Sequence, residues 1–160
     1  MKPVIDPVTP ETLGLLDRGL RALATDIGDP FHADATTLSA ALFGDAPACH
    51  GLVAHLSSED TPLGVALYSP VFSTVGGAAG VYVSDLWVAE RARGQSLGRR
   101  LLARVADDGA RLWQAGYMRL AAYDDNRGAL AAYDSMGFDV VRGETGLRLS
   151  GAAFDKIRSS

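Results

Sequence analysis

Apolar positions recur along this chain with two periods, one typical of helices and one typical of strands. Leucines return every three or four residues after Pro10 and again after Ser96, a spacing that places them on one face of an amphipathic helix. Gly116 is expected to end the second of these helices. The whole pattern predicts helices from Pro10 to Gly28, Asp34 to Phe43, Ser96 to Ala115, Asn126 to Met136 and Gly151 to Ile157.

Runs of β-branched and aromatic residues between turn signals predict the strands. They cover Val4 to Val8, Cys49 to Ser57, Leu63 to Phe72, Gly80 to Val88, Met118 to Tyr123, Phe138 to Val141 and Leu147 to Leu149. Three consecutive strands with short connections favour an antiparallel meander, whereas the later strand-helix-strand units favour parallel pairing. We therefore expect an α/β fold of the mixed α+β kind, in which helices flank a mixed sheet.

Length and composition indicate one domain that spans residues 1–160. Apolar residues make up 48% of the chain and charged residues 21%, and a chain of this size buries enough surface to fold without disulfides. The single Cys49 cannot form an internal bridge, and three histidines without paired cysteines exclude a zinc-finger site. We expect no bound metal.

Charge and hydropathy exclude two classes of partner. Nineteen acidic and fifteen basic residues give a net charge of −4, which argues against nucleic acid. The uncharged stretch from Leu63 to Ser84 is long enough to span a bilayer, but Pro70 and a glycine-rich break divide it into two strands. Asp6 interrupts the apolar run that an export signal requires, so a cytoplasmic protein without membrane contact is expected.

The loop from Ala89 to Gly98 joins a predicted strand to a predicted helix and is the most informative part of the sequence. A helix N-terminus presents unpaired N–H groups and a partial positive charge, and Gly94 and Gly98 leave room for a diphosphate. Arginines 93, 99 and 100 add charge-assisted donors. The pattern indicates a phosphate site, and an ordinary capped surface helix remains the alternative.

Three motifs together resemble the GNAT superfamily of acetyl-coenzyme A dependent N-acetyltransferases. The segment Arg93 to Gly98 matches the signature of Arg or Gln, two residues, Gly, one residue, then Gly or Ala, with Ser96 at the first glycine position. Tyr82 to Val88 is similar to the family's fourth strand, which splays from the fifth. Asn126 to Phe138 is similar to a later motif with Asn at a helix start, Tyr seven residues on, and Gly-Phe at its end. The resemblance implies a central mixed sheet of six to seven strands.

The same resemblance implies which residues bind acetyl-coenzyme A. They are Leu86, Trp87, Val88, Arg93, Gly94, Gln95, Ser96, Leu97, Gly98, Arg99, Asn126 and Tyr133. The hydroxyl of Ser96 could donate to a phosphate where φ is negative, whereas a positive φ would strain the loop and weaken cofactor affinity.

The expected chemistry is direct attack of an amine on the thioester through a tetrahedral intermediate. By resemblance, the N–H of Val88 faces the thioester oxygen and Tyr133 protonates the departing thiolate. Asp85 is the candidate base, because it is a carboxylate in an apolar strand, flanked on its own face by Val83 and Trp87. Each has a structural alternative: Tyr133 as a core aromatic, and Asp85 as the partner of an arginine or the cap of a loop.

Within the superfamily the chain is most similar to the spermidine/spermine (diamine) and thialysine acetyltransferases. That group usually has Glu-Asp where this chain has Ser84-Asp85, so the glutamate regarded as its base is missing. Asp26 lies where the diamine enzymes place amine-binding residues, although a solvated helix face is the alternative. The resemblance implies a small-molecule amine acceptor and a homodimer. A coenzyme A binding module without catalysis and a protein or peptide N-acetyltransferase stay open as alternative functions.

Overall fold

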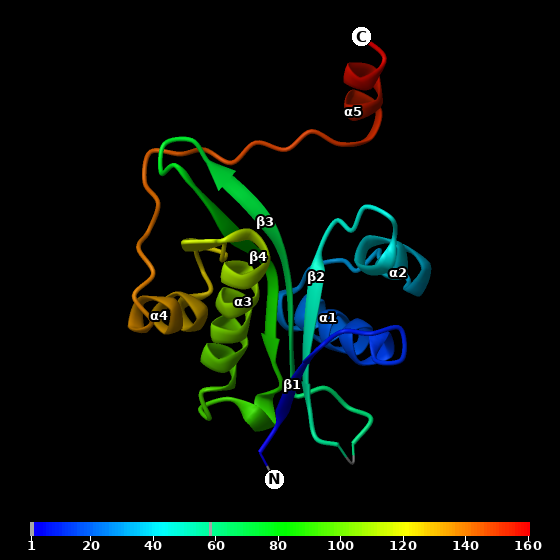
Figure 1. Cartoon of the computed structure of the whole chain (residues 1–160), viewed down its shortest axis with the longest axis vertical. Coiled ribbons are helices and arrows are strands. Elements are labelled where there is room, and N and C mark those ends of the chain that lie inside the picture. Colours follow the sequence, from blue (N-terminus) through cyan, green and yellow to red (C-terminus); the bar gives the residue numbers. More distant parts are fainter. Residues whose placement is uncertain (1, 58) are drawn as a thin grey trace. The chain divides into compact units, whose positions relative to one another are not determined.

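The computed structural model describes residues 2–57 and 59–160 (Figure 1). Packing divides the chain into two compact units. The first ends at Ala122, and the second runs from Tyr123 to Ser160.

The first unit is built on a sheet with strand order β1-β2-β3-β4-β5. Its strands are β1 (Val4–Pro7), β2 (His50–His55), β3 (Gly64–Ser73), β4 (Ala78–Val88) and β5 (Tyr117–Leu120). Neighbouring strands from β1 to β4 pair antiparallel, and for β2, β3 and β4 the short connections predict this. β4 and β5 pair parallel, and α3 (Leu97–Trp113) connects them.

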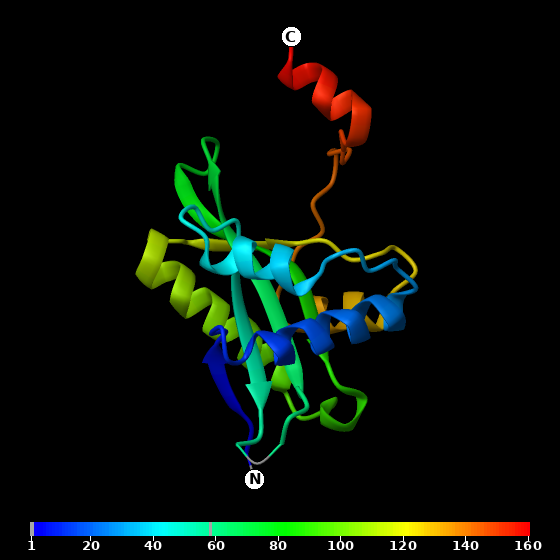
Figure 2. The same cartoon turned by 90° about the vertical axis from the view of Figure 1, so that its right-hand side faces the viewer.

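Helices cover both faces of this sheet (Figures 1 and 2). On one face α1 (Leu13–Ile27) and α2 (Ala35–Phe43) bury an apolar cluster that includes Leu16, Leu38 and Val65. On the other face α3 packs so closely that a Cβ on Gly109 would lie 2.3 Å from Val81 Cγ1. The expected mixed α/β fold is therefore confirmed for this unit.

Local sequence signals set most of the helix boundaries. Gly28 ends α1 with φ of 76°, the left-handed conformation that glycine adopts without a Cβ clash. Asp34 begins α2 as its N-cap by accepting the N–H of Thr37 at 2.8 Å. The prediction for α3 was wrong in detail, because Gln114 rather than Gly116 takes the left-handed position at its end.

A β-bulge in β4 determines which side chains share a face. Asp85 lies opposite Leu67, but Val83 lies opposite Tyr68, so Ser84 is the extra residue. Cross-strand partners face the same side, and Leu67 and Trp87 both pack in the cluster under α1 and α2. Asp85 and Trp87 therefore face α1 and α2, whereas Val83 faces α3. The expectation that Val83 flanks Asp85 on one face was wrong.

In the second unit the described residues form α4 (Arg127–Ser135) and α5 (Gly151–Arg158) and no strand. The strands predicted at 138–141 and 147–149 are therefore absent, and the sheet has five strands rather than six to seven. Their apolar side chains stay in solvent, with Val140 71% and Leu147 93% exposed. A strand is stable when a neighbour pairs with its backbone, and these segments have the β-type sequence without such a neighbour in the described chain.

The uncharged stretch that could be mistaken for a membrane span falls within β3 and β4 and the turn between them. In the described part of the chain, no helix combines the length and the apolar character needed to cross a membrane.

Candidate active site

A fork between β4 and β5 is the central feature of the first unit. The two strands pair from Gly80 and Tyr117 as far as Val83 and Leu120. β5 ends there, but β4 continues past the bulge at Ser84 to its end at residue 88. Past Leu120, the last part of β4 therefore has no partner strand on this side among the described residues, at the place where the splay is expected.

The bulge also decides which backbone groups of β4 point into this fork. Beyond β4, the N–H of Ala89 donates to the carbonyl of Leu63 at 2.9 Å. This hydrogen bond shows which residues of β4 direct their backbone N–H and C=O groups towards β3. Residues of an antiparallel strand alternate in direction, so Trp87 bonds to β3 while Leu86 and Val88 direct their N–H and C=O groups to the other side. The predicted oxyanion donor, the N–H of Val88, therefore points into the fork.

The loop after β4 leads into a helix start with free donors. Following a 3-10 turn at Glu90–Ala92, both Gly94 and Ser96 adopt positive φ, at 73° and 60°. Ser96, the N-cap of α3, makes no side-chain capping hydrogen bond, and among the described residues a Cβ on Gly98 would meet only Val88 Cγ2, at 3.6 Å. These open N–H groups fit the predicted diphosphate site.

The other side chains of the predicted loop site have different surroundings. Leu97 is only 2% exposed, so its side chain belongs to the core and only its backbone is available. Gln95 donates its amide N–H to the carbonyl of Arg91 at 3.2 Å. Arg99 is exposed in the first turn of α3, whereas Arg100 donates to the carbonyl of Pro3 at 2.8 Å.

Asp26 lies beside the loop and is held by two residues that the sequence analysis assigned to the cofactor. Its Oδ2 accepts the indole N–H of Trp87 at 3.0 Å and a guanidinium N–H of Arg93 at 2.7 Å. Arg93 also donates its Nε–H to the carbonyl of Val88 at 3.0 Å. The ion pair is about half exposed and contributes little stability, so its main effect is to orient Arg93. No local signal in the sequence indicated this contact.

Asp85 is a half-buried carboxylate on the face that α1 and α2 cover. Burial raises its pKa, and a hydrogen bond from Ser84 opposes that shift in part. The pKa of the Cys49 thiol is also raised, first by burial and then by the charge of Asp85. A carboxylate with a raised pKa is the stronger base, as the proposed role requires.

In the second unit, Asn126 and Tyr133 occupy the two ends of α4. Asn126 is the N-cap, and its Oδ1 accepts the N–H of Ala129 at 3.2 Å. The Tyr133 ring packs against Phe138 with a centroid distance of 5.4 Å, and burial raises the pKa of its hydroxyl. Tyr133 therefore stays protonated at neutral pH and is suited to donate a proton.

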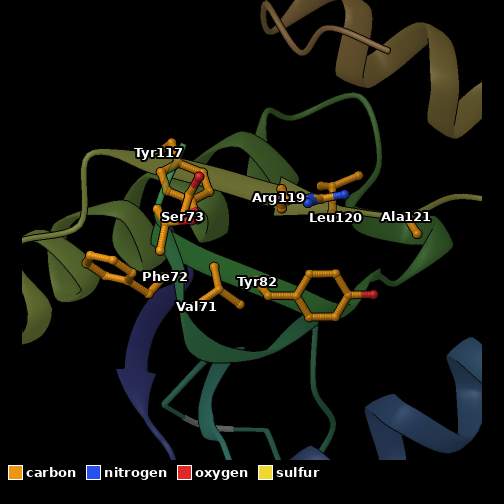
Figure 3. A pocket seen from close by; sticks show the side chains of 9 residues that line it. Val71, Phe72, Ser73, Tyr82, Tyr117, Arg119, Leu120 and Ala121 are labelled. Atoms are coloured by element: carbon orange, nitrogen blue, oxygen red, sulfur yellow. The ribbon is translucent and has the colours of Figure 1, made fainter. Parts of the chain in front are cut away.

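Sequence reasoning missed a pocket of about 570 Å³ at the far end of β3, β4 and β5 (Figure 3). Its polar lining includes Tyr82, Tyr117, Arg119 and Ser73, and Val71 forms part of its apolar wall. No motif marked these residues, because the strands bring them together from segments far apart in the sequence.

A buried charge network lies between the sheet and α3. Asp108 is 4% exposed and accepts hydrogen bonds from Tyr68 at 3.0 Å, Arg104 at 3.3 Å and Arg111 at 3.2 Å. Burial alone would raise the pKa of Asp108, but these donors outweigh it and the pKa is lowered. The network ties α3 to β3, and it uses none of the predicted site residues.

Comparison with known proteins identifies the family. A model described as Acetyltransferase (GNAT) family matches residues 20–138. Thialysine N-epsilon-acetyltransferase from Bos taurus is 32% identical over 136 residues, which are 78% of this chain and 76% of the relative.

Solved structures show the same fold over nearly the full length. An integron cassette protein from the mobile metagenome of V. cholerae superposes with a TM-score of 0.77 and 24% identity, over 100% of this chain and 99% of that one. A probable acetyltransferase superposes with a TM-score of 0.72 and 25% identity, over 93% and 98% of the two chains. Family model, curated relative and fold agree with the three motifs: the chain belongs to the acetyltransferase (GNAT) family and is an acyltransferase.

Proposed function

We propose that this acetyltransferase transfers the acetyl group of acetyl-coenzyme A to a primary amine of a small molecule. The observation that carries the proposal is the fork of β4 and β5, which opens beside the uncapped N-terminus of α3. The name of the bovine relative, which acetylates the ε-amine of thialysine, supports an amine of this class as acceptor.

The residues of the first unit fit acetyl-coenzyme A. The N–H groups at the start of α3 suit a diphosphate, and the backbone of Leu86, which points away from β3, suits an amide of an extended pantetheine arm. Arg93 and Arg99 supply positive charge at the loop. When bound, acetyl-coenzyme A supplies an activated thioester.

Three groups of the chain would act on the transfer. Val88 directs an N–H into the fork, where it can stabilise negative charge on the thioester oxygen. Asp85 accepts the proton of the amine, directly or through water, and Tyr133 donates a proton to the leaving thiolate. Asp26 is the proposed amine-binding carboxylate, and its second oxygen is the one that Trp87 and Arg93 do not use.

The function is tested by measuring free thiol released from acetyl-coenzyme A with a panel of diamines, polyamines, basic amino acids and peptides. We expect turnover with at least one small amine and none with peptides. Tight binding of acetyl-coenzyme A without turnover on the panel would instead indicate a coenzyme A binding module.

Ser96→Gly is expected to tighten coenzyme A binding. Serine at φ of 60° carries a Cβ clash that costs about 1 kcal/mol, and glycine removes it. The binding conformation of the loop then becomes more populated, and Kd for coenzyme A falls by up to about fivefold in a calorimetric titration. Ser96→Ala keeps the clash and is the matched control. Weaker binding by Ser96→Gly would show that the serine hydroxyl is itself a phosphate donor.

Asp85→Asn is expected to remove the acid limb of the pH profile of kcat/KM for the acceptor. Asp85 acts as a base only when ionised, so activity rises with pH through a pKa above the usual aspartate range. Asp107→Asn, an exposed change on α3, is the control and should leave the profile intact. An unchanged acid limb in Asp85→Asn would exclude Asp85 as the base.

The raised pKa of Asp85 also predicts a change in thermal stability, which can be measured without an activity assay. A carboxyl group whose pKa is raised on folding stabilises the fold at low pH, and this contribution is lost as pH rises through the folded pKa. Replacing Asp85 with asparagine should therefore raise Tm more at pH 8 than at pH 4.

Two further expectations from the sequence stay proposals, namely a homodimer and a cytoplasmic location. The exposed apolar side chains of Val140, Leu147 and Leu149 support self-association through the segment before α5. Analytical ultracentrifugation at several protein concentrations measures this self-association.

A further inference from the structure

The loop before α3 takes part in an ion pair at Arg91 that the proposed function does not use. Arg91 donates from Nη2 to Glu59 Oε2 at 2.7 Å and to Thr61 Oγ1 at 2.9 Å. Glu59 and Thr61 belong to the connection between β2 and β3, which lies at the same end of the sheet as the loop (Figures 1 and 2). The fold therefore ties the loop to a segment that is distant in the sequence.

The carboxylate of this pair is itself oriented. Thr61 donates its hydroxyl to Glu59 Oε2 at 3.3 Å, the same oxygen that Arg91 contacts. The hydrogen bond from Arg91 is the main cause that holds the pKa of Glu59 below its usual value, so Glu59 is ionised at neutral pH. The Arg91 and Glu59 side chains are 53% and 34% exposed, and such a pair adds little to global stability. Its effect is therefore local to the loop.

Arg91 is also connected to the part of the loop that has an unusual backbone. Its carbonyl accepts the side-chain amide of Gln95 at 3.2 Å, and Gln95 stands between Gly94 and Ser96, which have φ of 73° and 60°. A serine at positive φ is strained, and the conformation persists only where the surrounding structure holds it. Because α3 starts directly after Ser96, this turn directs the free N–H groups at the helix start.

A different element holds the loop at a second point. Arg93, two positions after Arg91, donates to Asp26 of α1 at 2.7 Å. The loop is thus fastened to α1 on one side and to the β2–β3 connection on the other. Two anchors on different elements restrict both the position and the rotation of the turn between them, whereas one anchor leaves the turn free to pivot.

We propose that Glu59 is a positioning residue, which acts through Arg91 to hold the loop before α3 in the conformation that binds the diphosphate of acetyl-coenzyme A. When the pair is broken, the loop populates other conformations, and the apparent affinity falls with the fraction that remains competent to bind. This inference rests on the proposed function, because it concerns the same diphosphate site.

Glu59→Gln gives opposite results for positioning and for simple electrostatics. Removing a negative charge near an anionic ligand should tighten its binding if charge alone matters. A positioning role predicts instead that Kd for coenzyme A rises by about threefold to tenfold in a calorimetric titration. KM for acetyl-coenzyme A should rise with it, while kcat at saturating cofactor and Tm without ligand stay near the wild-type values. Asp60→Asn removes the same charge from the exposed neighbour of Glu59 and is the matched control, with no rise in Kd.

Variants of Arg91 show whether its guanidinium acts by holding the loop. Arg91→Gln should raise Kd for coenzyme A about as much as Glu59→Gln does. The double variant should bind no more weakly than the weaker of the two single variants, because all three lose the same contact. Arg91→Lys keeps the charge and should recover part of the affinity.

The outcomes separate this inference from the proposed function. Unchanged or tighter binding of coenzyme A by Glu59→Gln would overturn the positioning role and leave the proposed function standing. If Arg91→Gln alone weakened binding, Arg91 would be a direct ligand of the phosphates and Glu59 would have no part in the site. A wild-type chain that does not bind coenzyme A would overturn the proposed function and this inference with it.

Discussion

Gly98→Asp is expected to abolish binding of acetyl-coenzyme A. The substituted carboxylate would stand in the first turn of α3, among the N–H groups that we assign to the diphosphate, and would repel it. An acidic residue in the first turn of a helix is itself stabilising by about 0.3–1 kcal/mol, so the fold should not suffer. Calorimetric titration should show no binding, while Tm without ligand stays at or slightly above the wild-type value.

Gly98→Ala separates the effect of charge from that of bulk. The added methyl group would meet only Val88 Cγ2, at an ordinary contact distance of 3.6 Å, and alanine favours the helix. Any loss of affinity in this variant therefore reports the space that the ligand needs. If Gly98→Asp retained wild-type affinity, the phosphates would have to bind elsewhere.

Tyr133→Phe is expected to lower kcat between tenfold and ten-thousandfold with little change in cofactor affinity. Burial raises the pKa of the Tyr133 hydroxyl, so at neutral pH the group is a proton donor. Phenylalanine keeps the ring that packs on Phe138, and the second unit should keep its structure. Steady-state kcat and the dissociation constant for coenzyme A give the two numbers to compare.

Tyr123→Phe is the matched control, because it removes a phenol hydroxyl from an exposed ring of the same unit. Its kcat should equal that of the wild type. A Tyr133→Phe enzyme with unchanged kcat would leave Tyr133 as a packing residue of α4, which is the structural alternative that the sequence left open.

Elements with strong local signals were the ones that could be predicted. The caps at Gly28 and Asp34, the leucine spacing of α1 and α3, and the three-stranded meander all appear near the expected positions. The predicted strands at 138–141 and 147–149 have the right composition and no partner in the described chain. Strand formation depends on a neighbour and not on sequence alone, which explains this error.

For the candidate site too, the contiguous part could be predicted from the sequence, and the part that depends on folding could not. The loop from Arg93 to Gly98 is contiguous, so its motif could be read directly and its helix start confirmed. Ser96 was recognised as the departure, but its positive φ could be known only from the folded loop. Asp85 was proposed because it is a carboxylate in an apolar strand; the structure places it in β4, and the bulge at Ser84 decided which face it takes.

By itself, the sequence determined the family and the order of most elements and pointed to the loop that we assign to a diphosphate, because these depend on local spacing and on contiguous motifs. Only the tertiary structure decided that Asp26 holds Arg93, that Asp85 faces α1 and α2, and that Arg119 lines a pocket at the start of the fork. Those residues come together through strand register and helix packing across long stretches of chain. A long-range contact of this kind leaves no periodic pattern in the sequence.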